Sequence, residues 1–209
     1  LTIQKLQRNQ YSDASDITNL MSSMNNLIHS GNASRVFSEV PEKLDIQYKI
    51  LQLIAEARKN EGIHHQKFND YYNQFLAGIK YSPENDSSDN LRNYKEALKG
   101  FRKIESDYEF ILENYLVNHV FSTLFPVSKD NNYLREFGFL ILHYSLIRIH
   151  LIGIHAHCDQ TFNKDVVISF IQSFSRNIGH NKSYLNKIYS FLEENELNNL
   201  AVYTILLRN

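Results

Sequence analysis

The sequence is poor in the residues that form disulfides and tight turns: among 209 residues it has 1 Cys, 3 Pro and 7 Gly. One Cys excludes a disulfide framework and any zinc or iron–sulfur site built from several cysteines of this chain. So few Gly and Pro argue against an all-β sandwich or barrel, because those folds need many tight turns. A single thiol in a chain of this length fits a reducing, cytoplasmic setting.

An excess of one charge is also lacking, since 22 Lys and Arg face 23 Asp and Glu, for a formal net charge of −1. Phosphate binding needs a clear basic surplus, so we expect no nucleic acid as a partner. Apolar residues make up 43% of the chain, with 13 Phe and 13 Tyr. This composition excludes disorder and is sufficient for one domain with a sizeable core.

The chain begins with Leu1 and has no basic segment followed by an apolar one, so we expect an excised piece of a longer protein and not a secreted precursor. Its most apolar run, residues 137–154, approaches the length of a membrane span, but His143, Arg148 and His150 interrupt it. Because charges are costly at the centre of a bilayer, this run predicts a buried helix and no membrane span.

Helical periodicity dominates the chain, and no pair of alternating strands stands out. The pattern predicts an all-α fold: a compact bundle of about seven to nine helices in a single domain over residues 1–209. Residues 108–125 and 134–154 are apolar on nearly all faces, so we expect them to be two buried central helices. Capping side chains predict several helix starts, among them Asn131 or Asn132, Asn163, and Asn181 or Ser183. The polar loop 81–89 is the place where the domain could subdivide.

The histidines do not predict a metal site. Glu61 and His64 have the Glu-x-x-His spacing of di-iron bundles, but the second copy that such a site requires is missing. His143, His150 and His157 recur every seven residues along one helix face, about 10.5 Å apart, which is too far for two of them to bind one ion. We interpret them as polar positions of a core helix, each paired with a neighbour.

Glycine-rich phosphate loops and a Gly-x-Ser-x-Gly elbow are absent from the sequence. Because no strand–turn–helix unit is evident either, we expect no Rossmann-type site for a nucleotide or S-adenosylmethionine within this chain.

Two polar clusters interrupt otherwise apolar segments. Asn114 and Asn118 are four residues apart beside Glu113, and such groups need partners when they are buried. Arg176 and His180 are also four apart, and Arg176 could form a bidentate pair with Glu113. Two interpretations stay open for these clusters: a polar network that locks helix packing, and a binding or catalytic site.

The same clusters carry a family resemblance. The segment Glu113-Asn-Tyr-Leu-Val-Asn118, followed by Phe121, Leu124, Phe125 and Pro126, resembles the C-terminal motif of flagellin lysine-N-methylases. Ser175-Arg176 with His180-Asn181 is similar to the second motif of that family, Arg-x-x-x-His-Asn, with Gly179 where an acidic residue is usual. The resemblance covers residues 108–189.

The resemblance implies a methyltransferase that transfers methyl groups from S-adenosylmethionine to lysines of flagellin in the cytoplasm. It also implies an iron–sulfur cluster held by a cysteine-rich motif in an N-terminal part of the protein. No residue of this chain matches a cluster ligand, so the chain would be the helical C-terminal portion, with its own N-terminal domain as a partner.

The implied reaction points to candidate residues, because a lysine ammonium must lose a proton before its nitrogen can attack a methyl group. The catalytic candidates are Glu113, Tyr115, His119 and His180. The candidates for substrate binding, or for a structural polar network, are Asn114, Asn118, Arg176 and Asn181.

Two other functions stay open. The chain could be a non-catalytic module that docks flagellin or another protein, which a flat exposed apolar patch would favour. It could also be a helical ligand-binding or dimerisation domain like those of bacterial transcriptional regulators, which an apolar cavity between the long helices would favour. A concave polar cleft lined by Glu113, Asn118, Arg176 and His180 would favour the enzyme.

Overall fold

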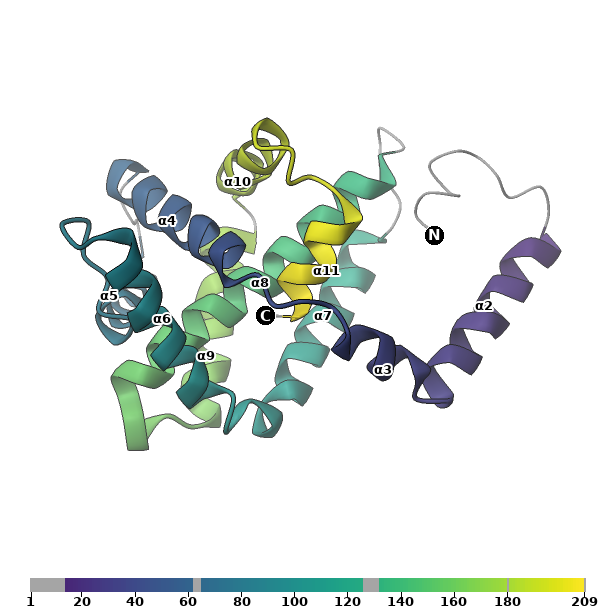
Figure 1. The fold of residues 1–209 in the computed structure, drawn as a ribbon, viewed down its shortest axis with the longest axis horizontal. Helices are drawn as coiled ribbons and strands as arrows, with labels where there is room; N and C mark the ends of the chain where they lie inside the picture. The colour runs from purple at the N-terminus through teal and green to yellow at the C-terminus, as the bar shows by residue number, and fades with distance from the viewer. Residues whose placement is uncertain (1–13, 62–64, 126–131, 180, 209) are drawn as a thin grey trace.

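The computed structural model describes residues 14–61, 65–125, 132–179 and 181–208, and over these ranges it contains helices and no β-strand (Figure 1). Nine of its α-helices have nine residues or more, which confirms the predicted all-α fold and helix number. The helices are α2 (Ala14–His29), α3 (Asn32–Ser38), α4 (Leu44–Glu61), α5 (Gln66–Gly78), α6 (Ser87–Phe101), α7 (Glu109–Thr123), α8 (Tyr133–Cys158), α9 (Lys164–Phe174), α10 (Lys182–Glu194) and α11 (Leu200–Arg208).

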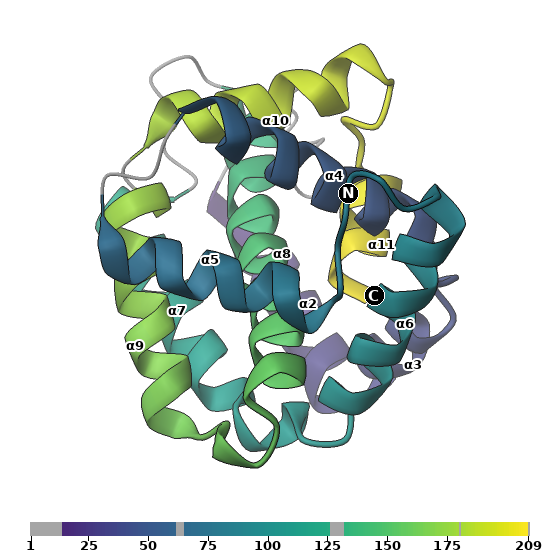
Figure 2. The same cartoon turned by 90° about the vertical axis from the view of Figure 1, so that its left-hand side faces the viewer.

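Helix α8 is the centre of the fold. Between Ile141 and Ile154 every residue except Tyr144 is buried, because α5 and α6 pack along it and α7, α9, α10 and α11 also contact it. Figure 2 shows α5 crossing α8. Among the described residues, Tyr133–Thr161 is long and apolar enough to cross a membrane, yet 78% of its most apolar stretch is buried by the other helices. This burial is typical of a core helix, as the interrupted apolar run predicts.

Helix α7 is not the second buried central helix that the sequence predicts. Its buried residues are Ile111 and Leu112, whereas Phe121 is 76% exposed. Helix α7 lies against α8 and α9. A helix that is apolar all round gives the same sequence pattern whether its outer face is covered or open, so periodicity alone could not distinguish α7 from α8. The other exposed apolar side chains on α7 and at its end are Phe110, Val117 and Leu124.

The structure confirms the predicted asparagine caps at the starts of α8, α9 and α10. The Asn132 side chain accepts a hydrogen bond from the Arg135 N–H at 3.1 Å, at the start of α8. The Asn163 side chain accepts from two backbone N–H groups at the start of α9, and Asn181 accepts from Tyr184 N–H at 3.1 Å at the start of α10. Each cap satisfies an N–H that the helix itself cannot pair.

Helix α9 continues into a π-helical segment, Ser175–Gly179. The sequence predicts an ordinary helix to residue 178, and the wider turn is not visible in its periodicity. Inside the turn, the Asn177 side chain donates to the Ser173 carbonyl at 2.7 Å. The segment therefore carries α9 toward the Asn181 cap of α10 by an irregular path.

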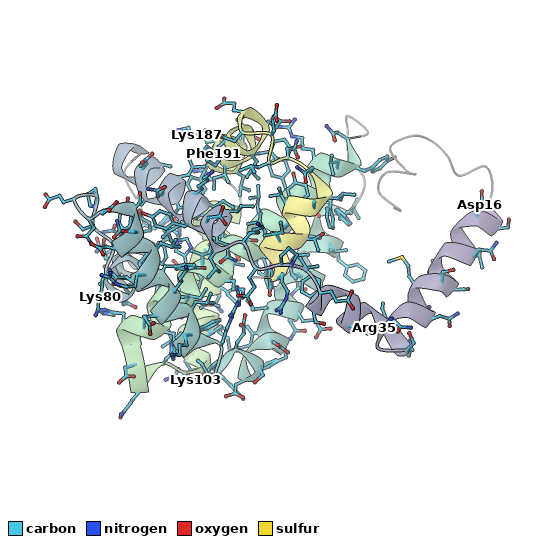
Figure 3. The ribbon with its side chains drawn as sticks, in the orientation of Figure 1. Asp16, Arg35, Lys80, Lys103, Lys187 and Phe191 are labelled. Carbon is cyan, nitrogen blue, oxygen red and sulfur yellow. The ribbon has the colours of Figure 1, made fainter. Side chains whose placement is uncertain are left out.

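Helices α2 and α3 extend away from the remaining helices (Figure 1). Figure 3 shows the side chains around Asp16 and Arg35 on this extension, at a distance from the densely packed side chains of the helical body. The apolar side chains of Met21, Met24 and Ile28 are exposed there. The core therefore consists of α4 to α11.

Candidate functional site

A cleft of about 870 Å³ lies between α7 and the end of α9 with its π-helical extension. These two elements neighbour one another in the fold, and both contact α8 (Figure 2). Two isoleucines contribute to the wall of the cleft, and most of the other lining side chains end in an amide, a hydroxyl or a charged group. The lining residues are Ile111, Asn114, Tyr115, Asn118, His119, Ser122, Thr123, Ile171, Gln172, Ser175 and Arg176.

The cleft brings together five of the eight candidate residues that the sequence singles out. Asn114, Tyr115, Asn118 and His119 come from α7, and Arg176 comes from the π-helical segment. One cavity is therefore lined by parts of both motifs: Asn114, Tyr115 and Asn118 from the first, and Ser175 and Arg176 from the second. Their roles in binding or catalysis stay predictions.

Two of the other candidates have different surroundings. Glu113 is exposed and does not line the cleft, and it forms no ion pair with Arg176, so the bidentate pair that the sequence suggests is wrong. Both side chains are solvated, and an exposed pair gains little from contact. The Asn181 side chain caps α10. His180 lies outside the described residues.

A buried ion pair forms elsewhere, between Arg148 on α8 and Glu105 in the 3₁₀ turn Glu105–Asp107. It is bidentate, with Nε–Oε1 and Nη2–Oε2 distances of 2.5 and 2.9 Å, and the two side chains are only 6% and 17% exposed. Burial opposes the charge of the guanidinium, but the hydrogen bond and the negative charge of Glu105 outweigh it and raise the pKa of Arg148. The only signal in the sequence is an arginine within the most apolar run.

Tyr115, His119 and His143 form a compact cluster beside the cleft. The Tyr115 hydroxyl and His143 Nδ1 are 2.8 Å apart and share a hydrogen bond. The ring centroids of His119 and His143 are 4.4 Å apart, and the Tyr115 ring stacks on His119 with 24° between their planes. Phe174 of α9 packs edge-on against both Tyr115 and His143. The cluster thus ties α7, α8 and α9 together.

Burial sets the protonation states in this cluster. It raises the pKa of Tyr115 to about 12, against a smaller opposing effect of a hydrogen bond with Ser175. It lowers the pKa of His119, because the imidazolium ion would lose solvation there. At neutral pH, Tyr115 therefore keeps its proton, and His119 is uncharged with a free lone pair.

Sequence reasoning assigned His143 to the core and missed its link to the cleft. The residue is only 2% exposed, as a core position should be, but its hydrogen bond to Tyr115 spans 28 residues. His150 also fits the core prediction: it is fully buried, and its Nδ1 is hydrogen-bonded to the Leu146 carbonyl. His157, at the C-terminal end of the same helix, is exposed.

The residues that the structure describes do not fit an iron–sulfur cluster. No group of three His, Cys, Asp or Glu lies close enough among them to hold a metal ion, and the chain has 1 Cys where such a cluster takes about four thiolates. The described lining of the cleft contains Arg176 and neither Asp nor Glu. An acidic residue is the partner of the ribose hydroxyl in dinucleotide-binding folds, and the described lining does not supply that partner.

Comparison with known proteins gave one family match. The family model described as the FliB lysine N-methylase C-terminal domain matches residues 1–206. Neither the curated proteins nor the solved structures gave a match. The matched range includes both walls of the cleft.

Proposed function

The chain belongs to the FliB lysine N-methylase C-terminal domain family, and from this premise we propose that its α7–α9 cleft binds the polypeptide whose lysine is methylated. In this proposal the substrate is flagellin, the methyl donor is S-adenosylmethionine, and the reaction takes place in the cytoplasm. The observation that carries the proposal is the convergence of both motifs on one polar cleft.

The polar groups of the cleft suit an extended polypeptide. Asn114 and Asn118 lie one helical turn apart on one wall, and Gln172 and Arg176 lie one turn apart on the other. An amide side chain offers both a donor and an acceptor, which is what a peptide backbone requires of its partner. Arg176 adds an attraction for acidic side chains that flank the lysine.

Exposed apolar side chains on α7 favour a macromolecular substrate. Phe121 and Val117 are exposed on α7, the helix that supplies one wall of the cleft. Exposed aromatic side chains are typical of the points at which protein partners gain most of their binding energy. A small substrate would leave these side chains in water.

The test compares variants of the intact methylase in flagellin methylation with labelled S-adenosylmethionine. Asn118→Ala and Arg176→Ala should each raise KM for flagellin about tenfold or more, because each removes a substrate contact while leaving the fold intact. Asn73→Ala and Arg92→Ala are matched controls, since both residues are exposed and lie on α5 and α6, outside the cleft. Unchanged KM values in both cleft variants would refute the proposal.

A non-catalytic docking module is the second candidate. The exposed apolar side chains of α7 favour it, because such a surface can bind flagellin without any chemistry. Both functions predict a raised KM for flagellin, and they differ in kcat at saturating flagellin. Substitutions in a pure docking module leave kcat unaltered, whereas substitution of a cleft residue that takes part in the reaction lowers it.

A further inference from the structure

We propose that His119 takes the proton from the lysine ammonium that enters the α7–α9 cleft, while Tyr115 and His143 hold its imidazole in place. This inference rests on the proposed function and names the proton acceptor within that same site.

The arrangement of the candidates selects His119. Glu113 does not line the cleft. The Tyr115 hydroxyl is hydrogen-bonded to His143, and its pKa of about 12 keeps it protonated at neutral pH, so it cannot accept the proton. His119 lines the cleft, is half-buried, and holds a free lone pair at neutral pH because burial lowers its pKa.

His143 acts through Tyr115 and does not meet the substrate. It is 2% exposed on the central helix, and it does not line the cleft. Its hydrogen bond fixes the Tyr115 ring, whose face stacks on His119, and its own ring lies 4.4 Å from His119. A proton acceptor needs such support, because its efficiency depends on a fixed orientation toward the proton it takes.

The groups around His119 also act on the incoming ammonium. They are Tyr115 on the same helix, His143 on α8, and Ser175 and Arg176 on the opposite wall. Within the described part of the chain, no Asp or Glu joins the two histidines in a group of three. A free lysine has a pKa of about 10.4, well above that of a histidine. The positive charge of Arg176 and the isoleucines of the cleft lower the pKa of the ammonium, which narrows this gap.

The proposed step is one proton transfer. An N–H bond of the ammonium breaks, its electron pair stays on Nζ, and a new N–H bond forms on a ring nitrogen of His119. The imidazolium then releases the proton to water at the open side of the cleft. The neutral amine keeps the lone pair that a methyl group requires.

The main test is His119→Gln in the intact methylase. At neutral pH we expect kcat to fall by about 10²- to 10⁴-fold, with little change in KM for flagellin, because an acceptor is lost and a binding contact is not. The defect should shrink as the pH approaches about 10, where the lysine loses its proton to water. His157→Gln is the matched control, since His157 is an exposed histidine outside the cleft.

A second pair of variants tests the positioning role. His143→Leu removes the hydrogen bond to Tyr115 and should lower kcat about tenfold and shift the titration of the His119 ring in an NMR pH series. His143→Gln keeps an oxygen that can accept a hydrogen bond from the Tyr115 hydroxyl, so it should restore most of kcat and the original titration. Recovery of kcat in His143→Gln, which lacks the imidazole ring, is the outcome that depends on the hydrogen bond to Tyr115.

An unchanged kcat in His119→Gln overturns the inference and leaves the proposed function intact, because the latter depends on the KM of Asn118→Ala and Arg176→Ala. If His119→Gln does not fold, NMR of the wild-type chain replaces it. The His119 signal should then titrate below pH 6.5 and respond to a lysine-containing flagellin peptide. No response to the peptide would equally overturn the inference.

Discussion

Gly78 on α5 and Gly153 on α8 meet backbone to backbone where the two helices cross. A Cβ atom added to Gly78 would lie 1.9 Å from the Gly153 carbonyl oxygen, and one added to Gly153 would lie 2.4 Å from the Phe75 carbonyl oxygen. Neither neighbour is a flexible side chain that could move away. Side chains larger than hydrogen would therefore push apart the most extensive helix pair of the fold.

We predict that Gly153→Ala destabilises the protein by about 1–3 kcal/mol, because it overpacks this crossing. Gly100 on α6 is the matched control, since the nearest atom to an added Cβ there is a side-chain carbon at 3.5 Å. Gly100→Ala should stabilise the helix by up to about 1 kcal/mol through the better helix propensity of alanine. Urea unfolding followed by circular dichroism measures both, and equal effects would contradict the close-contact explanation.

The buried Arg148–Glu105 ion pair predicts that one substitution of similar shape lowers the free energy of unfolding substantially. Glu105→Gln keeps the shape of the side chain but leaves a guanidinium that is 6% exposed without its counter-charge. We expect a loss of about 3 kcal/mol or more in the free energy of unfolding. Asp89→Asn breaks the exposed pair with Arg92, whose side chains are 45% and 70% exposed, and should cost less than about 1 kcal/mol. Similar losses of unfolding free energy in the two variants would contradict the prediction that burial makes the Arg148–Glu105 pair costly to break.

Acid should destabilise the fold through His119. Its folded-state pKa is lower than the ordinary value of 6.5, so the unfolded chain binds a proton more readily than the folded one. The contribution is therefore fully present above pH 6.5 and decreases as the pH falls from there toward the folded pKa. His155 contributes in the same direction, because burial lowers its pKa too. In urea unfolding between pH 5 and 8, His119→Gln should flatten the acid side of the stability profile. An identical profile in wild type and variant would exclude this origin.

Because the outer face of α7 is open, we predict that a substitution there weakens flagellin binding without changing the stability of the fold. Phe121 is 76% exposed, so Phe121→Ser should change the free energy of unfolding by no more than about 0.5 kcal/mol. The same change should weaken flagellin binding about tenfold or more, because the exposed ring supplies apolar contact area to a protein partner. Met21→Ser is a comparable apolar-to-polar change on α2, at an exposed residue on the extension (Figure 1), and should leave binding unchanged. Surface plasmon resonance with immobilised flagellin provides the readout.

What the sequence could predict was local. The caps at Asn132, Asn163 and Asn181 depend on hydrogen bonds to backbone groups two or three residues further on, so a short pattern contains all their information. The convergence of Asn118 and Arg176 on one cleft agrees with the motif analysis, because both residues interrupt apolar segments with polar groups. The helical periodicity of the chain was equally sufficient for the fold class.

What the sequence could not predict depends on distant partners. Arg148 and Glu105 are 43 residues apart, and Tyr115 and His143 are 28 apart, so no spacing rule links either pair. The exposure of α7 could not be predicted either, because the composition of α7 resembles that of the buried helix α8. Only the packing of α5 and α6 along α8 decides which of the two helices is enclosed.

The π-helical segment Ser175–Gly179 couples two parts of the molecule that look independent. It supplies Ser175 and Arg176 to the cleft, and it leads directly to the Asn181 cap that orients α10. Removing one residue from this widened turn would return it to α-helical winding and shift the side chains that the turn presents to the cleft. The shape of the cleft wall and the position of α10 therefore depend on the same short segment, and a deletion in it would alter both.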